Sequence, residues 1–133
     1  MLVEDELITA MDIRRMLEKS GYDVSATISS GKEAVFKAQE INPDLIIMDI
    51  FLSDEMDGIE ASEAIMSKLD IPVVFLTANA DTSTFKRADQ IKHYGYLLKP
   101  IKQCDLNSII STAIQRHDLE AKAKTGKRDN YLS

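Results

Sequence analysis

The 133-residue chain contains no tryptophan, three prolines and a single cysteine, Cys104. One cysteine excludes an internal disulfide, and no group of cysteines and histidines has the spacing of a zinc site. No apolar run approaches the length of a membrane span, and no secretory segment opens the chain. These absences predict a cytoplasmic protein that works in a reducing compartment and has no membrane partner.

Positive charge is also in deficit, since 16 basic residues stand against 22 acidic ones and the net charge is −6. This balance disfavours direct binding of nucleic acid. The apolar fraction of 44% and the charged fraction of 29% are ordinary for a globular protein, and the length suits one hydrophobic core.

Five short apolar segments alternate with helical patterns along the chain. The expected strands are Met1–Val3, Tyr22–Ile28, Leu45–Asp49, Val73–Leu76 and Gly95–Leu98. The expected helices run from Leu7 to a stop at Gly21, from Ser30 as N-cap to Ile41, from Gly58 to Leu69, from Asp81 to Lys92, and from Gln103 to His117 or beyond. Such alternation implies right-handed crossovers, and therefore a doubly wound α/β fold. We expect five parallel strands in the flavodoxin-like order 2-1-3-4-5, with helices on both faces.

Polar residues follow four of these strands where each strand ends. Asp49 directly follows four apolar residues, Glu4 and Asp5 follow the first strand, and Thr77 and Lys99 follow the last two. Because the carboxyl ends of parallel strands meet at one edge of the sheet, we expect these side chains to converge in its ligand crevice.

The chemistry of this set suits phosphoryl transfer to an aspartate. Three crowded carboxylates repel one another, and Mg²⁺ with oxygen ligands resolves that conflict. Lys99 adds a cation suited to phosphate oxygens, while the Thr77 hydroxyl and the backbone N–H of Ala78 add neutral donors. The set predicts that Asp49 is a nucleophile that forms an aspartyl phosphate.

Each of these residues also has a plainer structural explanation. Glu4 and Asp5 suit the positive end of a helix dipole, and Asp49 and Lys99 could be ordinary strand ends. Thr77 could cap the following helix. The structural explanations need four coincidences at one sheet edge, so the functional interpretation is preferred. His93, His117 and Cys104 have no catalytic partner at readable spacing and are expected to be structural or solvent-facing.

Five short motifs lie in the order and at the spacing of a known family: Val3–Glu6, Ile46–Asp49, Asp57–Gly58, Phe75–Ala78 and Gly95–Pro100. In them the chain resembles the CheY-like receiver domain of two-component response regulators, over about residues 1–118. The resemblance implies that Asp49 takes a phosphoryl group from a phosphohistidine on a sensor histidine kinase or a phosphotransfer protein. It also implies a signalling phosphoacceptor that catalyses its own phosphorylation and dephosphorylation, rather than an enzyme with a separate substrate.

The resemblance further implies the metal ligands. Asp5 would bind Mg²⁺ directly, Glu4 mainly through water, and Asp49 and the carbonyl of Phe51 would complete the protein ligands. Lys99 would pair with Asp49 and then with its phosphate.

A switch is implied as well, in which Thr77 moves to the phosphate and Tyr96 rotates into the vacated space; without the resemblance, Tyr96 would be interpreted as packing. The helix over 81–92, the last strand and the last helix would present the switched face to a downstream protein, whose identity is open, as is homodimer formation. Residues 51 and 79 would control water access and hence the lifetime of the phosphoryl group. The bulk of Phe51 predicts slow hydrolysis.

The chain departs from the family pattern in the loop after Asp49. Ser53 stands where the family often has proline, and Asp57–Gly58 arrives one residue late. We therefore expect a longer and more acidic loop over 50–57. The first strand is also short. Residues 119–133 are expected to be a helical extension or a linker tail, too brief for a DNA-binding domain.

Three alternatives accompany this interpretation. The chain could be a receiver module of a larger hybrid kinase or regulator. It could be an Asp-nucleophile phosphohydrolase, although such enzymes commonly place an acid two residues after the nucleophile, where this chain has Phe51. It could also be an interaction module without chemistry, which the intact Asp49, Lys99 and Thr77 argue against.

Overall fold

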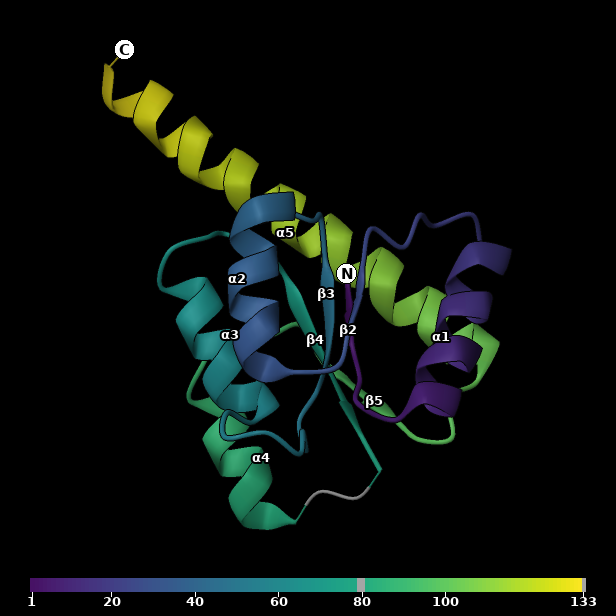
Figure 1. Ribbon diagram of the computed structural model, residues 1–133. Helices are drawn as coiled ribbons and strands as arrows, with labels where there is room; N and C mark the ends of the chain where they lie inside the picture. Colours follow the sequence, from purple (N-terminus) through teal and green to yellow (C-terminus); the bar gives the residue numbers. More distant parts are fainter. Residues whose placement is uncertain (79–80, 133) are drawn as a thin grey trace.

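The computed structural model describes residues 1–78 and 81–132. They form a parallel five-stranded sheet in the order β2-β1-β3-β4-β5, which confirms the expected fold class (Figure 1). The elements in chain order are β1 (Leu2–Val3), α1 (Leu7–Lys19), β2 (Thr27–Ile28), α2 (Gly31–Ile41), β3 (Ile46–Asp49), α3 (Gly58–Met66), β4 (Val73–Thr77), α4 (Thr82–Asp89), β5 (Tyr96–Leu98) and α5 (Gln103–Leu132).

Helices cover both faces of the sheet, and each face has its own apolar core. On one face α1 and α5 pack over the strands, with Leu2, Ile13, Ile47, Val74, Leu97 and Ile110 among the buried residues. On the other face α2, α3 and α4 pack over Val3, Met48 and Phe75, among others. Consecutive residues of β3 and β4 alternate between the two cores, so these central strands are apolar up to their last residues, Asp49 and Thr77.

The strand register gathers the carboxyl ends at one edge. Val3 lies beside Met48, so that Glu4 follows at the level of Asp49. Asp49 in turn lies beside Leu76, and Thr77 beside Leu98. Each candidate acceptor, metal or phosphate residue is thus the last residue of its strand or follows it closely, whereas Tyr96 begins β5.

The second strand is much shorter than the predicted Tyr22–Ile28. Only Thr27 and Ile28 pair in the sheet, because β1 offers only Leu2 and Val3 as partners. Residues 22–26 keep an alternating pattern of exposure, and the Ala26 carbonyl accepts from the Leu2 N–H at 3.0 Å, but the pairing of β1 with β2 begins only at Leu2 and Thr27. The alternation predicted the conformation of the segment and could not predict the length of its neighbour.

The helix ends follow local capping chemistry. Ser30 caps α2 as predicted, with its Oγ accepting a hydrogen bond from the Glu33 N–H at 3.2 Å. Asn42 ends α2 in the left-handed region, with φ of 51°, directly before Pro43. Helices α3 and α4 end at Met66 and Asp89, each three residues earlier than predicted.

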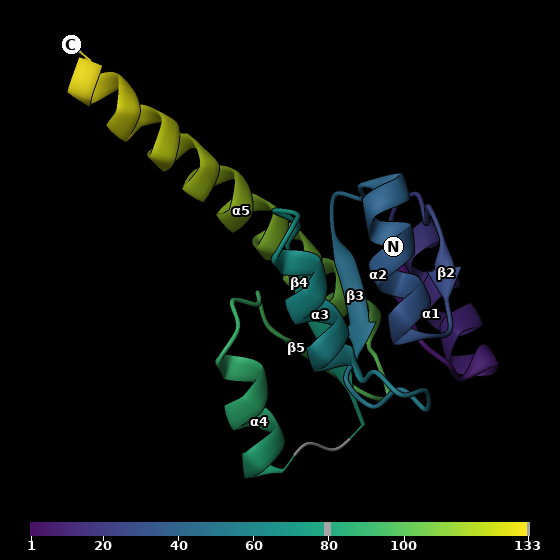
Figure 2. The same cartoon turned by 60° about the vertical axis from the view of Figure 1, so that its left-hand side comes forward.

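Helix α5 continues without interruption through residue 118, and its C-terminal part leaves the body of the molecule (Figures 1 and 2). Polar contacts join this part of the helix to the body. Glu120 accepts a hydrogen bond from the Tyr94 hydroxyl at 2.7 Å and pairs with Lys92 at 2.5 Å. His117 lies 3.1 Å from Asp70. A boundary at residue 118 between domain and tail stays a prediction. In the described part of the chain, no helix has both the length and the apolar character needed to cross a bilayer.

Candidate functional site

Three carboxylates meet at the carboxyl ends of β1 and β3. One oxygen from each of Glu4, Asp5 and Asp49 lies within 4.8 Å of the others. Glu4 is 2% exposed and Asp49 is 3% exposed, whereas Asp5 is half-buried. The structure therefore brings together the three acidic side chains that the sequence analysis selected, and it buries two of them.

Lys99 lies between two of these carboxylates. Its Nζ is 2.5 Å from Glu4 Oε1 and 3.1 Å from Asp49 Oδ2. The Lys99 backbone N–H donates to the Thr77 carbonyl at 2.9 Å, which continues the pairing of β4 and β5, and the Lys99–Pro100 peptide is cis. The ammonium group offsets part of the acidic charge.

Burial and crowding change the acidity of the site. Burial, with the neighbouring Asp49 carboxylate, raises the pKa of Glu4 to about 7, although Lys99 pulls it down. Burial lowers the pKa of Lys99, but the two carboxylates more than offset this, so its pKa is raised. Burial raises the pKa of Asp5, yet hydrogen bonds from Ser53 and Glu4 outweigh it and the pKa is lowered.

The donor set fits a hard divalent cation. All three candidate ligands offer carboxylate oxygens, and the raised pKa of the buried Glu4 marks a negative charge that the protein alone compensates poorly. The Phe51 N–H donates to Asp49 Oδ1 at 3.1 Å, and its side chain is 52% exposed. A ligand role for the Phe51 carbonyl stays a prediction.

Thr77 supplies a buried hydroxyl at the end of β4. The residue is fully buried, and within the described part of the chain its Oγ1 has no hydrogen-bond partner. A buried hydroxyl without a partner is costly, so a phosphate oxygen that could accept from it would remove a penalty. Ala78 follows at the exposed end of the strand. Asn79, expected to affect water access, lies outside the described residues.

Tyr96 is held at its hydroxyl by α4. The hydroxyl donates to Asp89 Oδ1 at 2.7 Å, and His93 Nε2 lies 2.8 Å from the same oxygen. The Phe85 ring contacts Tyr96 edge-on, with ring centroids 4.8 Å apart. Burial and the Asp89 carboxylate together raise the pKa of Tyr96.

The part that Asp89 and His93 play around Tyr96 was missed by the sequence analysis. His93 has a structural role, as expected: its ring lies 4.6 Å from that of Tyr96, and its Nδ1 accepts from the Gly95 N–H at 3.1 Å. The spacing of Asp89 and His93, one helical turn apart, is the one signal that could have paired them.

The loop over 50–57 closes the site on one side. Asp57 caps α3 through a reciprocal pair of hydrogen bonds with Glu60, and its other oxygen accepts from Arg87 of α4 at 2.9 Å. Gly58 approaches the end of β3 so closely that a Cβ there would lie 1.9 Å from the Asp49 carbonyl oxygen. This contact explains why glycine follows Asp57 at the start of α3.

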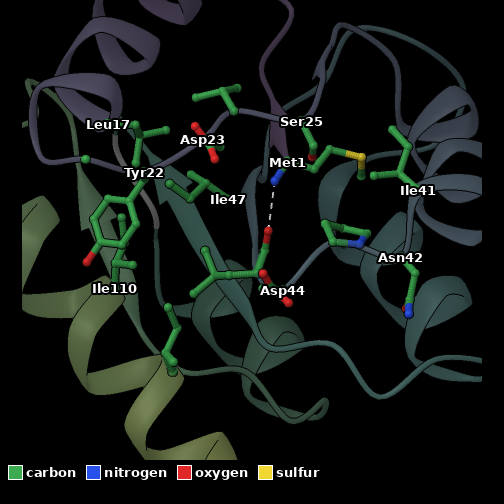
Figure 3. A pocket seen from close by; sticks show the side chains of 15 residues that line it. Met1, Leu17, Tyr22, Asp23, Ser25, Ile41, Asn42, Asp44, Ile47 and Ile110 are labelled. Atoms are coloured by element: carbon green, nitrogen blue, oxygen red, sulfur yellow. Dashed lines mark hydrogen bonds between the residues drawn. The ribbon is translucent and has the colours of Figure 1, made fainter.

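A separate cavity of about 410 Å³ lies at the opposite, amino-terminal edge of the sheet (Figure 3). Tyr22, Asp44 and Ile110 are among its lining residues, and the amino group of Met1 there donates to the Leu45 carbonyl at 2.9 Å. None of the site residues named above lines this cavity.

Comparisons with known proteins agree with the geometry. A family model described as the response regulator receiver domain matches residues 1–111. The transcriptional regulatory protein PdtaR of Mycobacterium tuberculosis is 37% identical over 116 residues, which cover 87% of this chain and 56% of that protein. The chain thus spans about half the length of the curated relatives it matches.

Solved structures show the same similarity. The signal receiver domain of a modulated diguanylate cyclase from Desulfovibrio desulfuricans aligns with a TM-score of 0.86 at 36% identity, covering 90% of this chain and 94% of that one. The receiver domain of a sensor histidine kinase from Pseudomonas aeruginosa aligns with a TM-score of 0.78 at 32% identity, covering 86% and 94%. That structure holds a magnesium ion coordinated in its active-site cleft.

Proposed function

The chain belongs to the family of response regulator receiver domains of two-component systems, and we propose that Asp49 is its phosphoacceptor. The observation that carries this proposal is the buried Asp49 carboxylate at the end of β3, 3.1 Å from Lys99 and within 4.8 Å of two further carboxylates. A carboxylate so placed lies at the ligand-binding edge of the sheet and is already paired with a cation that suits phosphate.

In the proposed reaction one Asp49 oxygen attacks the phosphorus of a phosphohistidine. The new O–P bond forms as the P–N bond breaks, and the imidazole leaves with the electron pair. Glu4, Asp5 and Asp49 would hold Mg²⁺, which when bound neutralises charge on the phosphoryl oxygens. Lys99 then moves its ion pair from the Asp49 carboxylate to the attached phosphoryl group.

The product state would complete the hydrogen bonding of β4. The Thr77 hydroxyl and the Ala78 N–H would donate to phosphoryl oxygens, which gives the buried Oγ1 a partner. Movement of Thr77 would open space beside β4, into which the Tyr96 ring could turn once its bond to Asp89 breaks. The face formed by α4, β5 and α5 would then differ between the two states and be read by a downstream partner.

Receiver domains interact with histidine kinases or phosphotransfer proteins, and we assign one of these as the donor for this chain. Self-catalysed dephosphorylation, a cytoplasmic location and a larger parent protein also belong to the proposal. The parent-protein proposal is supported by the greater length of the matched relatives.

The test is incubation of the protein with Mg²⁺ and acetyl phosphate, followed by intact-mass measurement. We expect a gain of one phosphoryl group that requires Mg²⁺ during the incubation and is absent in Asp49→Ala. Asp44→Ala is the matched control, because Asp44 precedes the same strand at its other end and should leave phosphorylation intact.

Two outcomes would overturn the proposal. Steady turnover of phosphate esters without a stable phosphorylated protein would support a hydrolase. Absence of any reaction with Mg²⁺, for both the native chain and the Asp44→Ala control, would leave an interaction module.

A further inference from the structure

The loop over 50–57 departs from the family pattern, and it joins the acidic site to the first turn of α2. Ser53, at the position where proline is common, donates its backbone N–H to Asp5 Oδ2 at 3.0 Å. Proline has no N–H and could not make this bond. The bond restrains the Asp5 carboxylate, which also supplies an oxygen to the acidic cluster.

The next residue, Asp54, anchors this loop on α2. Its Oδ2 accepts from Ser30 Oγ at 3.0 Å and from the Lys32 N–H at 3.3 Å, while its Oδ1 accepts from the Gly31 N–H at 3.3 Å. These N–H groups belong to the first turn of the helix, where they have no partner within the helix and favour a negative charge. The exposed Asp54 carboxylate therefore accepts hydrogen bonds from three donors at the start of α2.

A second close contact fixes the same part of the loop. A Cβ on Gly31 would lie 2.5 Å from the Met56 carbonyl oxygen, so the loop backbone runs directly against the start of α2. Ser53 thus lies between a carboxylate of the acidic site and an anchor on a neighbouring helix.

We propose that Asp54 is a positioning residue for the metal site, although it does not belong to the acidic cluster itself. By fixing the loop to α2, Asp54 holds the Ser53 N–H on Asp5, and the Asp5 carboxylate is thereby held in a fixed orientation for Mg²⁺. The inference rests on the proposed function, because it requires Asp5 to be a Mg²⁺ ligand. Outer partners that orient metal-binding side chains typically affect metal affinity by about 10–100-fold.

The chain offers a matched control for charge. Asp54 and Glu55 are adjacent, exposed and equally charged, but Glu55 has no hydrogen-bond or ion-pair partner among the described residues. If Asp54 acted only through its negative charge, removing either carboxylate would weaken Mg²⁺ binding to a similar extent. A positioning role predicts that only Asp54 matters.

The experiment measures Mg²⁺ affinity by isothermal titration calorimetry in the unphosphorylated protein. We expect Asp54→Ala to raise the Kd by about 10-fold, the lower end of the usual range, because Asp54 acts through Ser53. Glu55→Ala should change the Kd by less than about twofold, because an exposed charge is screened. Amide hydrogen exchange at Gly31 and Lys32 should accelerate in Asp54→Ala alone.

A second pair of variants tests the same link without touching the anchor. Ser53→Pro removes the N–H that bonds Asp5 and should raise the Kd about as much as Asp54→Ala, with exchange at Gly31 unchanged. Ser53→Ala keeps that N–H and removes only the hydroxyl, which also interacts with Asp5, so it should retain more of the affinity than Ser53→Pro. The double variant Ser53→Pro/Asp54→Ala should bind no more weakly than Ser53→Pro, because both changes break one linkage.

The possible failures are distinguishable. If the native chain binds Mg²⁺ and Asp54→Ala binds it as Glu55→Ala does, the positioning role is wrong and the proposed function stands. If the native chain binds no Mg²⁺, both are overturned. Should Asp54→Ala fail to fold, the comparison of Ser53→Pro with Ser53→Ala decides, and equal affinities overturn the inference.

Discussion

At the scale of the residue, ionisation of Glu4 carries an electrostatic cost. It is a buried carboxyl whose pKa is raised to about 7 from an ordinary value of 4.5, chiefly by burial. The folded protein therefore holds the Glu4 proton more tightly than the unfolded chain does. Between those two pKa values, rising pH ionises Glu4 in the unfolded chain while the folded protein keeps the proton, so stability falls across this range and the full cost is present above neutral pH.

We predict that Glu4→Gln stabilises the Mg²⁺-free protein at pH 8 by on the order of 1–2 kcal/mol, and has little effect near pH 4. The amide keeps the shape of the protonated acid and cannot ionise. Urea unfolding of both proteins in EDTA across this pH range gives the difference directly. A constant difference at all pH values would show that ionisation of Glu4 carries no cost.

Phe51 is the second residue whose effect can be tested singly. Its N–H bonds Asp49, and its bulky apolar side chain follows directly in the loop. We predict that Phe51→Asn shortens the half-life of the phosphorylated protein several-fold, because a smaller polar side chain admits water. The decay is followed by intact mass, with Phe36→Asn as control, since Phe36 is an exposed phenylalanine of α2. Equal half-lives in all three proteins would refute the prediction.

At the scale of the element, α4 and β5 are joined by the cluster of Asp89, His93 and Tyr96. One oxygen of Asp89 receives both the Tyr96 hydroxyl and His93 Nε2. The lowered pKa of Asp89, caused first by the Tyr96 hydrogen bond and then by His93, agrees with this arrangement. Tyr96 therefore has a specific partner to leave before it can turn inward.

We predict that Asp89→Ala lowers the pKa of Tyr96, which nevertheless stays above its ordinary value because the burial remains. The pKa is measured by NMR titration of the tyrosine rings. Tyr94, whose hydroxyl bonds Glu120 instead, should be unaffected. The control Glu63→Ala removes an exposed carboxylate of α3 and should leave Tyr96 unchanged. An unchanged Tyr96 pKa in Asp89→Ala would mean that this hydrogen bond does not form in solution.

At the scale of the whole molecule, Mg²⁺ binding and folding should be linked, because the three candidate ligands converge only in the folded chain. We predict that Mg²⁺ raises the Tm, with a gain of about 2.7 kcal/mol when its free concentration is 100 times the Kd. Asp5→Asn should lose most of this gain, as measured by thermal unfolding at increasing Mg²⁺. Equal stabilisation of both proteins would place the ion at another site.

The order of the elements and the convergence of Asp49 and Lys99 could be predicted from the sequence, because they follow from rules that act along the chain. Alternating periodicities specify a parallel sheet, and the residue after each strand must then lie at its carboxyl edge. The apolar run Ile46–Met48 needed no further information to be placed in the centre of the sheet, buried on both faces.

Other features depend on partners that lie far away in sequence. The length of β2 is set by the residues of β1 that pair with it, and the periodicity within Tyr22–Ile28 carries no information about the length of β1. The attachment of Asp54 to α2 depends on the path of the loop in space. The sequence therefore predicted a more acidic loop but not the contact of Asp54 with α2. The contact between the rings of His93 and Tyr96 likewise could not be predicted from the sequence.

The bonds from Glu120 to Tyr94 and Lys92 give α5 a mechanical property. They lie near the point where the helix leaves the body, and twelve further residues rising about 1.5 Å each extend it by about 18 Å to Leu132. Helix α5 is thus attached to the body close to β5, the strand that carries Tyr96, and extends outward from there. A tilt of α5 by about 10° at Glu120 would move its C-terminal end by about 3 Å. A small displacement beside β5 would therefore become a larger one at the end of the helix.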